Sequence, residues 1–345
     1  MQKWRLASSC LRCVSKRVNS FSTHITTLRC LFCFPVTLST RKIYAYTLAQ
    51  RKTAVEKTNI KRFDITESRT AVNFYEENGF VIVKNFYPTE DLQDFKLEVK
   101  NIINAHLLKA GFEEMDSSND SILSIGILAL EEKDHEYVAA VYDTIFQSPS
   151  FFRILGNRNT ESYIKHLLHI DSSHALYGFT NRCRIDPPKD NRRTYGWHQE
   201  VFYTIPKGSY IQTWAPLIFD TTFENGTIEV AVGSHNEKIA NQTWNESEGK
   251  ATQILVDDNI VNKYEQRVVE MKVGEILFFS GFLAHRSGNN VSQQVRYSLV
   301  GMYHDVKHKP FFTPKLGFEF RKSSPKEYFD EVFKERRHEE ERRRK

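Results

Sequence analysis

Acidic residues are absent from the start of the chain. Residues 1–55 contain ten basic residues and no carboxylate, and the first acidic residue is Glu56. The whole chain of 345 residues has a formal charge of +5, yet residues 56–333 hold 31 basic and 39 acidic residues, a net charge of −8. Because nucleic-acid binding needs positive charge clustered on a folded face, this acidic body indicates no nucleic-acid partner.

Cysteine and long apolar runs are scarce in the same body. Only Cys183 lies beyond residue 55, so we expect no disulfide framework. No uninterrupted apolar run approaches the ~18 residues that a membrane-spanning helix needs. The sequence therefore predicts a globular body with a hydrophobic core and no integral membrane segment.

The other four cysteines lie in the acid-free segment with the spacing C-x2-C, sixteen residues, C-x2-C, which is typical of a tetrahedral zinc site. However, residues 1–55 contain no glycine for the tight turns of a zinc knuckle, and they are rich in Arg, Ser and Thr, as mitochondrial transit peptides are. We predict a targeting or disordered leader over residues 1–60, with a zinc site or a misassigned start codon as alternatives. The cysteines concerned are Cys10, Cys13, Cys30 and Cys33.

The leader predicts a mitochondrial location, with a peroxisomal or cytoplasmic location as alternatives. Arg17-Val18 followed by His24-Ile25 approaches a peroxisomal N-terminal signal of the form Arg-aliphatic, five residues, His-Leu or His-Ala, but it misses the last position. The chain does not end in the peroxisomal tripeptide Ser-Lys-Leu.

Helical patterns dominate the first half of the body. A short helix is expected to end at Asn78-Gly79, since glycine readily takes the left-handed C-terminal position. A longer helix begins at Pro88-Thr89 and keeps apolar residues at helical spacing up to Gly111. Further helices are expected between about 130 and 170.

Short β-type runs separated by turn signals follow Ser173. Helices first and strands afterwards predict one mainly β domain with flanking helices, a β-sandwich or jelly roll, over residues 61–325. We expect an inserted loop or helix over 236–266 and a charged C-terminal tail over 326–345, helical from Lys334. The predicted strands are 80–83, 176–185, 210–219, 227–232, 268–273, 275–280 and 295–304.

Trp197-His198-Gln199-Glu200 is the densest chemical signal. On a strand, His198 and Glu200 would project from the same face and could reach one metal ion. His285, which directly follows a predicted strand, is a third candidate ligand. Two histidines and one carboxylate form the facial triad of mononuclear non-haem iron(II), which leaves adjacent coordination positions for a co-substrate and O2.

Arg296 and Ser298 are candidates for binding that co-substrate. If 2-oxoglutarate chelates the iron through its 2-oxo acid end, its far carboxylate needs a partner, because an unpaired buried charge is very costly. Arg296 lies on the next predicted strand, and its planar guanidinium matches a carboxylate bidentately. Ser298 faces the same side and has a hydroxyl to donate.

These residues belong to a series of motifs that resembles the phytanoyl-CoA dioxygenase family of iron(II)/2-oxoglutarate oxygenases. The series keeps its order and spacing over residues 65–305. Its members are Asn78-Gly79-Phe80-Val81-Ile82-Val83, Trp197-His198-Gln199-Glu200-Val201-Phe202-Tyr203, Thr213-Trp214-Ala215-Pro216-Leu217, Glu224-Asn225-Gly226-Thr227-Ile228, Gly233-Ser234-His235, Gly274-Glu275-Ile276-Leu277-Phe278-Phe279, His285 with Asn289, and Arg296.

The resemblance implies a double-stranded β-helix, a cupin-like jelly roll, in which His198, Glu200 and His285 hold iron. Arg296 would bind 2-oxoglutarate. It further implies O2-dependent hydroxylation of an unactivated C–H bond in a small-molecule or lipid substrate, with succinate and CO2 as co-products. Aspartate is the commoner carboxylate of the family, so Glu200, one methylene longer, is a departure that bears on metal affinity.

Two other functions stay open. The fold could serve as a catalytically inactive ligand-binding module, or as a metal oxygenase that uses no 2-oxoglutarate. Outside the triad, we interpret His235 as a turn residue and His166 and His169 as solvated groups. We interpret Arg184 as a solvated charge in preference to a contact for an acidic substrate. The sequence predicts neither the substrate nor the oligomeric state.

Overall fold

The computed structural model describes residues 60–190, 192, 194–205, 207–246, 252–311 and 325–343, so the predicted leader with its cysteines lies outside the described residues. Helices dominate the first part of this range. The short helix ends as predicted, because Gly79 has a φ of 82° and its N–H donates to the Tyr75 carbonyl. The helices before the main strands are α2 (Ser68–Asn78), α3 (Thr89–Lys109), α4 (Ile122–Lys133), α5 (His135–Phe146), α6 (Pro149–Leu155) and α7 (Arg158–Leu167).

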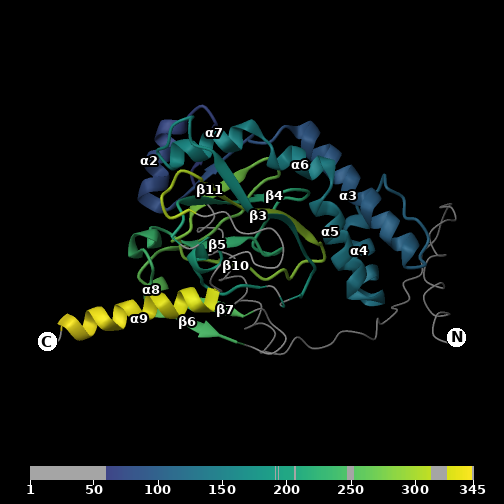
Figure 1. The fold of residues 1–345 in the computed structure, drawn as a ribbon. Helices are drawn as coiled ribbons and strands as arrows, with labels where there is room; N and C mark the ends of the chain where they lie inside the picture. Colours follow the sequence, from purple (N-terminus) through teal and green to yellow (C-terminus); the bar gives the residue numbers. More distant parts are fainter. Residues whose placement is uncertain are drawn as a thin grey trace, which may run out of the picture. The chain divides into compact units, whose positions relative to one another are not determined.

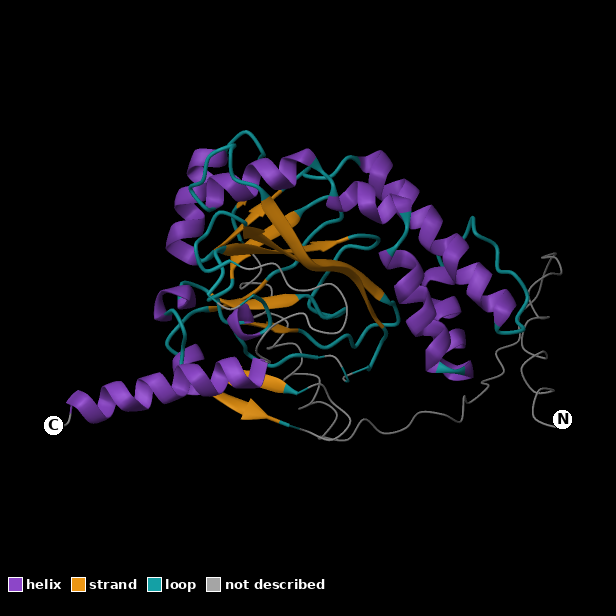
Figure 2. Cartoon of the chain, in the orientation of Figure 1, coloured by secondary structure: helices purple, strands orange, loops and turns teal. Residues whose placement is uncertain are grey.

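A six-stranded sheet forms the centre of the fold (Figures 1 and 2). Its strand order is β1-β2-β9-β4-β11-β3, and all neighbours are antiparallel except β1 and β2. Apart from β1, which was not predicted, these strands lie at or within a few residues of their predicted positions. They are β1 (Arg62–Phe63), β2 (Phe80–Val83), β3 (Leu176–Asp186), β4 (Tyr210–Pro216), β9 (Ile276–Ser280) and β11 (Arg296–Asp305).

A smaller sheet, in the order β10-β5-β8, packs on the large one. It contains β5 (Ile228–Ala231), β8 (Gln266–Val268) and β10 (His285–Ser287), and His198 extends it through an isolated bridge to His285. The jelly-roll strands can be numbered 1 to 8 in chain order: β3, the bridge segment at His198, β4, β5, β8, β9, β10 and β11. In this numbering the large sheet has the order 1-8-3-6 and the small sheet has the order 2-7-4-5. This is the double Greek key of a jelly roll, so the predicted fold is confirmed.

Both faces of the large sheet are buried. Val81 and Val83 pack into the core cluster formed with the helices, whereas Phe80 and Ile82 pack with Val230 of the small sheet. Alternate residues of a strand point to opposite faces, so a strand covered on both sides must be apolar throughout. This requirement explains the uninterrupted run 80–83, and Figure 1 shows the helices α2, α6 and α7 across the outer side of the sheet.

Two predictions for the later part of the chain are wrong. The segment 236–266 contains, besides the short helix α8 (Asp258–Val261), a two-stranded hairpin of β6 (Gln242–Asn245) and β7 (Gln253–Val256), not just a loop or helix. The strand predicted over 268–273 ends at Val268, and only Met271 adds a bridge, to Thr221. Short, irregularly alternating segments of this kind give weak periodic signals.

The predicted C-terminal helix is present but begins earlier, at Pro325, and extends to Arg343 (α9). Its half-buried Phe329, Val332 and Phe333 pack on Phe202 and Ile254. The first part of the helix is therefore joined to the body through apolar contacts. Among the described residues, no helix is both long and apolar enough to cross a membrane.

We predict that Gly226→Ala destabilises the fold strongly. Gly226 has a φ of 81°, and a Cβ there would lie 2.5 Å from the Gly288 carbonyl oxygen and 2.7 Å from backbone atoms of the next two residues. Backbone cannot yield as a flexible side chain does, so the free energy of unfolding should fall by about 2–4 kcal/mol in urea titrations.

Gly111→Ala is the matched control, because Gly111 has a φ of 84° but no atom within 4 Å of the added Cβ. Its free energy of unfolding should fall by only about 1 kcal/mol, which is the cost of a non-glycine residue at a positive φ. Equal losses in the two variants would contradict the steric argument.

Candidate metal centre and cavity

His198 and His285 are joined by their backbones. The His198 N–H donates to the His285 carbonyl at 2.9 Å, and the His285 N–H donates to the His198 carbonyl at 3.0 Å. This reciprocal pair is one narrow rung of an antiparallel ladder, which brings the two side chains close together on one face. The ring centroids are 4.2 Å apart.

Each of these imidazoles is oriented by a carbonyl two residues before it. His198 Nδ1 lies 2.8 Å from the Gly196 oxygen, and His285 Nδ1 lies 3.0 Å from the Leu283 oxygen. A carbonyl only accepts, so Nδ1 carries the proton in both rings and Nε2 is left as the ligand atom. Burial, followed by the influence of His198, lowers the pKa of His285 to about 3, so its imidazole is neutral.

Glu200 completes the group, although it does not lie on a strand as predicted. It begins a 3-10 turn, η1 (Glu200–Phe202), and its N–H donates to the Gly281 carbonyl at 3.0 Å. Its Oε2 lies 3.6 Å from His198 Nε2 and 3.8 Å from His285 Nε2. Within the described residues this is the one group of three whose ligand atoms all lie within 4.8 Å of each other.

The carboxylate of Glu200 is ionised. Burial alone would raise its pKa, but a hydrogen bond and the charge interaction with His198, the charge interaction with His285 and a hydrogen bond from Gln212 outweigh burial and lower the pKa to about 2. Metal ligands must be deprotonated, and the ionised carboxylate of Glu200 meets this condition. Gln212 of β4 was not predicted as part of the site, since nothing in the strand pattern distinguishes it.

Gln199, between the two candidate ligands, is fully buried and ties three segments together. Its Nε2 donates to the Lys238 and Phe282 carbonyls at 2.6 and 2.5 Å. Its Oε1 accepts from the Ala240 N–H at 3.0 Å and from Gln242 Nε2 at 2.8 Å. All four hydrogen-bonding positions of the amide are used, so Gln199 fixes the chain that carries His198 and Glu200.

Tyr203 connects the centre to the β6–β7 hairpin. Its hydroxyl accepts from the Ile254 N–H at 2.6 Å, and its ring lies edge-on to His198. The preceding Phe202 packs against Phe329 of α9 with ring centroids 5.7 Å apart. The hairpin and α9 therefore support the segment that contains Glu200. Neither element belongs to the jelly roll.

Arg296 lies at the start of β11, directly opposite Asp186 of β3. Its Nη2 donates to Asp186 Oδ2 at 2.8 Å, and its Nη1 donates to the Asn225 carbonyl at 3.3 Å. Arg184 donates to the other carboxylate oxygen of Asp186 at 2.6 Å. Burial would raise the pKa of Asp186, but the two arginines hold it well below its usual range.

Two buried polar atoms at this end of the site lack a partner among the described residues. They are Nε of Arg296 and Oγ of Ser298, and these residues are 5% and 0% exposed. Buried polar groups almost always have hydrogen-bond partners, so a pair of orphaned donors two residues apart on one strand indicates a missing polar ligand.

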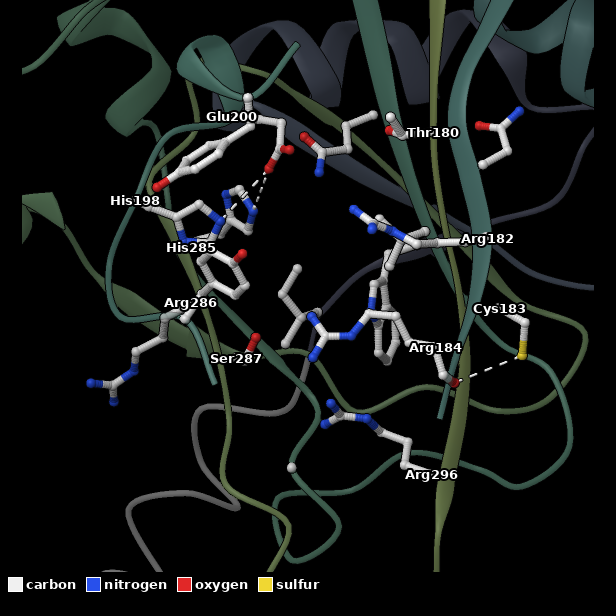
Figure 3. A pocket seen from close by; sticks show the side chains of 18 of the residues that line it. Thr180, Arg182, Cys183, Arg184, His198, Glu200, His285, Arg286, Ser287 and Arg296 are labelled. Atoms are coloured by element: carbon white, nitrogen blue, oxygen red, sulfur yellow. Dashed lines mark hydrogen bonds and ion pairs between the residues drawn. The ribbon is translucent and has the colours of Figure 1, made fainter. Parts of the chain in front are cut away.

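A cavity of about 720 Å³ extends from the three candidate ligands to Arg296. Figure 3 shows Arg182, Arg184 and Arg296 facing His198 and His285 across this space. Its volume is within the range of ordinary small-molecule sites. Aromatic rings also line it, namely Tyr142, Phe146, Tyr195, Tyr203, Trp214 and Phe279.

Among the residues that the structure describes, the histidines that line this cavity are those of the triad. His235 is in a 3-10 turn, donates from Nε2 to the Glu76 carbonyl at 3.0 Å, and lies so close to Gly79 that a Cβ there would clash with its ring. His166 and His169 are exposed. Cys183 lines the cavity wall, but burial raises the pKa of its thiol, so it is not a reactive thiolate.

Comparison with known proteins identifies one family. The sequence model of the phytanoyl-CoA dioxygenase family (PhyH) matches residues 75–298. This range contains all three candidate metal ligands as well as Arg296 and Ser298.

Individual relatives are distant. The chain is 26% identical over 234 residues to the human protein "Phytanoyl-CoA dioxygenase, peroxisomal", which covers 66% of this chain and 65% of that protein. The chain thus spans slightly less than two thirds of that relative.

It is 22% identical over 234 residues to "1-deoxypentalenic acid 11-beta-hydroxylase" of Streptomyces exfoliatus, covering 66% of this chain and 77% of that protein. The solved structure of the epimerase SnoN with Fe3+, alpha ketoglutarate and nogalamycin RO gives a TM-score of 0.49 at 15% identity, covering 75% of this chain and 94% of that chain.

We predict that Glu200→Ala and His198→Ala each weaken the binding of Mn(II) or anaerobic Fe(II) by more than about 100-fold, since removal of groups that only orient metal ligands already costs 10- to 100-fold. Isothermal titration calorimetry measures this. His166→Ala, which removes an exposed histidine, is the control and should bind as the wild type does. Unchanged affinity in Glu200→Ala would rule out the triad as the metal centre.

Proposed function

We propose, from the premise that the chain belongs to the phytanoyl-CoA dioxygenase family, that it is an Fe(II)/2-oxoglutarate-dependent dioxygenase. It would hydroxylate an unactivated C–H bond of a small-molecule or lipid substrate, with succinate and CO2 as co-products. The observation that carries the proposal is the convergence of His198, Glu200 and His285 on one point at the wall of a cavity whose other end holds Arg296.

The donor set fits iron(II). Two neutral imidazoles and one carboxylate are the ligands of mononuclear non-haem iron, whereas structural zinc sites favour thiolates. When bound, iron would supply the activation of O2. The protein's own part is to hold both Nε2 atoms and the Glu200 carboxylate in place, which the backbone rung and Gln212 do.

The far end of the cavity fits 2-oxoglutarate. Arg296 Nε and Ser298 Oγ are buried donors with no partner in the described part of the chain, and a carboxylate accepts from both kinds of group. Asp186 occupies only one side of the guanidinium, at Nη2. Arg296 is therefore held in place by Asp186 and the Asn225 carbonyl while part of its donor set stays available to the co-substrate.

We further propose that residues 61–325 form the oxygenase domain, with residues 1–60 as a leader and 326–345 as a charged tail. The family match and both sheets lie inside 61–325, which supports this division. The human relative is named as peroxisomal, and this favours the peroxisomal alternative. The mitochondrial location indicated by the leader stays a prediction.

Relatives do not agree on the substrate. The human protein is named for an acyl-CoA thioester and the Streptomyces protein for a free carboxylic acid. We propose a small-molecule or lipid substrate for this chain, in line with both.

The proposal predicts a visible charge-transfer band when Fe(II) and 2-oxoglutarate are added anaerobically to the purified full-length chain. Arg296→Ala should raise the dissociation constant for 2-oxoglutarate about 10- to 100-fold, because a hydrogen-bonded charged group contributes about 1.5–3 kcal/mol. Absorbance titration measures both.

Arg158→Ala removes an exposed arginine on α7 and is the control for the loss of one positive charge. Metal binding without any band, and no succinate in air, would favour a ligand-binding module. Full turnover in Arg296→Ala would favour an oxygenase that uses no 2-oxoglutarate.

A further inference from the structure

The C-terminal helix α9 contacts the turn that carries Glu200. It lies outside the family match over residues 75–298 and belongs to neither sheet of the jelly roll, yet it packs on η1. Figure 1 shows α9 beside the β6–β7 hairpin, and both elements contact one buried cluster formed by Val201, Phe202 and Ile254. The helix is therefore connected directly to the segment of one candidate metal ligand.

Phe329 is the central contact of this helix. Its ring centroid lies 5.7 Å from that of Phe202 in η1 and 6.1 Å from that of Trp244 in β6. A further ring, that of Phe333 one turn along α9, lies 4.6 Å from it. Phe202 is fully buried, and Phe329 supplies part of the apolar surface that covers it. A smaller side chain at position 329 would leave a gap beside the Phe202 ring.

The polar contacts of α9 are exposed. Arg336 Nη1 donates to Asn241 Oδ1 at 3.0 Å, and Lys207 Nζ lies 3.5 Å from Glu331 Oε1. Exposed ion pairs contribute little to stability, so α9 is held on the body chiefly by its apolar side chains.

Glu200 has less backbone support than the two histidines. His198 and His285 exchange two backbone hydrogen bonds, whereas Glu200 begins a three-residue 3-10 turn and donates one, to the Gly281 carbonyl. Short 3-10 turns have poor hydrogen-bond geometry, so the packing of side chains such as Phe202 decides where the turn lies. Metal coordination tolerates movement of only about 0.2 Å, so a small shift of this turn would matter.

We infer that Phe329 is a positioning residue for the metal centre. By packing on Phe202 it holds the η1 turn where the Glu200 carboxylate faces both imidazoles, and docking of α9 thereby raises the affinity for the metal ion. This inference rests on the proposed function and deepens it. Coupling between two sites is reciprocal, so a bound metal ion must favour the docked helix by the same factor.

Calorimetric titration of the full-length chain with Mn(II) tests the role of Phe329. Phe329→Ala should weaken Mn(II) binding about 10-fold, the lower end of the effect of groups that orient metal ligands. Phe329→Leu keeps apolar bulk beside Phe202 and should keep most of the affinity.

Two controls separate positioning from a general loss of stability. Val99→Ala shortens a fully buried side chain of α3, in the core cluster formed with the helices, and should lower stability without changing Mn(II) affinity. Lys334→Ala changes an exposed residue of α9 and should bind Mn(II) as the wild type does. Urea titrations compare the stabilities of Val99→Ala and Phe329→Ala.

Ni(II) titrations in a second background show whether Phe329 acts through Glu200. Ni(II) binds nitrogen ligands more tightly than Mn(II) does, so His198 and His285 should still bind it in Glu200→Ala. Phe329→Ala should weaken Ni(II) binding in the wild-type background and have no further effect in Glu200→Ala.

Limited digestion with trypsin tests the reciprocal effect. Cleavage after Arg336 or Arg337 requires local opening of α9, so Mn(II) should slow it in the wild type. In Glu200→Ala, Mn(II) should give no such protection.

Four results would overturn the inference: Mn(II) affinity unchanged in Phe329→Ala, an equal loss of affinity in Val99→Ala, an equal loss of Ni(II) affinity with and without Glu200, or no effect of Mn(II) on cleavage within α9. The wild type tests the proposed function separately. A full-length chain that binds no divalent metal would contradict the metal centre itself, whereas a chain that binds metal equally well in Phe329→Ala would contradict only the role of Phe329.

Discussion

The pair of backbone hydrogen bonds between His198 and His285 is the interaction on which the candidate site depends. It joins two segments far apart in the sequence and is a rung of the small sheet, so it forms only when the jelly roll has closed. Because each imidazole donates Nδ1–H to the carbonyl two residues before it, the rung also sets the tautomers. Fold closure and the alignment of two candidate metal ligands are thus one structural event.

The third candidate ligand is held differently. Glu200 has left the strand and begins a 3-10 turn, where Gln212 and the Gly281 carbonyl orient it from opposite ends of the residue. The glutamate side chain is one methylene longer than that of aspartate, so it can place its carboxylate next to both Nε2 atoms although its backbone has left the strand direction. Glu200 thus reaches both Nε2 atoms from a 3-10 turn, and this turn is supported by Phe202 packing on α9.

The sequence was sufficient for the jelly roll and for the residues that converge on the centre. His198 and Glu200 could be predicted as a group from their spacing, and His285 because it directly follows an apolar strand, whereas the role predicted for Arg296 stays a proposal. The residues that hold the three candidate ligands in place could not be predicted in this way. Gln212 and Tyr203 act through contacts with distant segments, and no local pattern distinguishes them from ordinary strand and turn residues. Arg184 was interpreted as solvated, whereas it is paired with Asp186 inside the cavity wall.

The Arg184–Asp186–Arg296 cluster is better explained by function than by stability. The free-energy cost of removing two charges from water is usually about as large as the free energy of their attraction, so a buried ion pair contributes little to stability. Arg296 is 5% exposed and must nevertheless stay charged in the absence of a co-substrate. Asp186 offsets that cost, and by binding two arginines it leaves the cluster with one positive charge. On the proposed function, that surplus would let the buried guanidinium of Arg296 attract the carboxylate of 2-oxoglutarate.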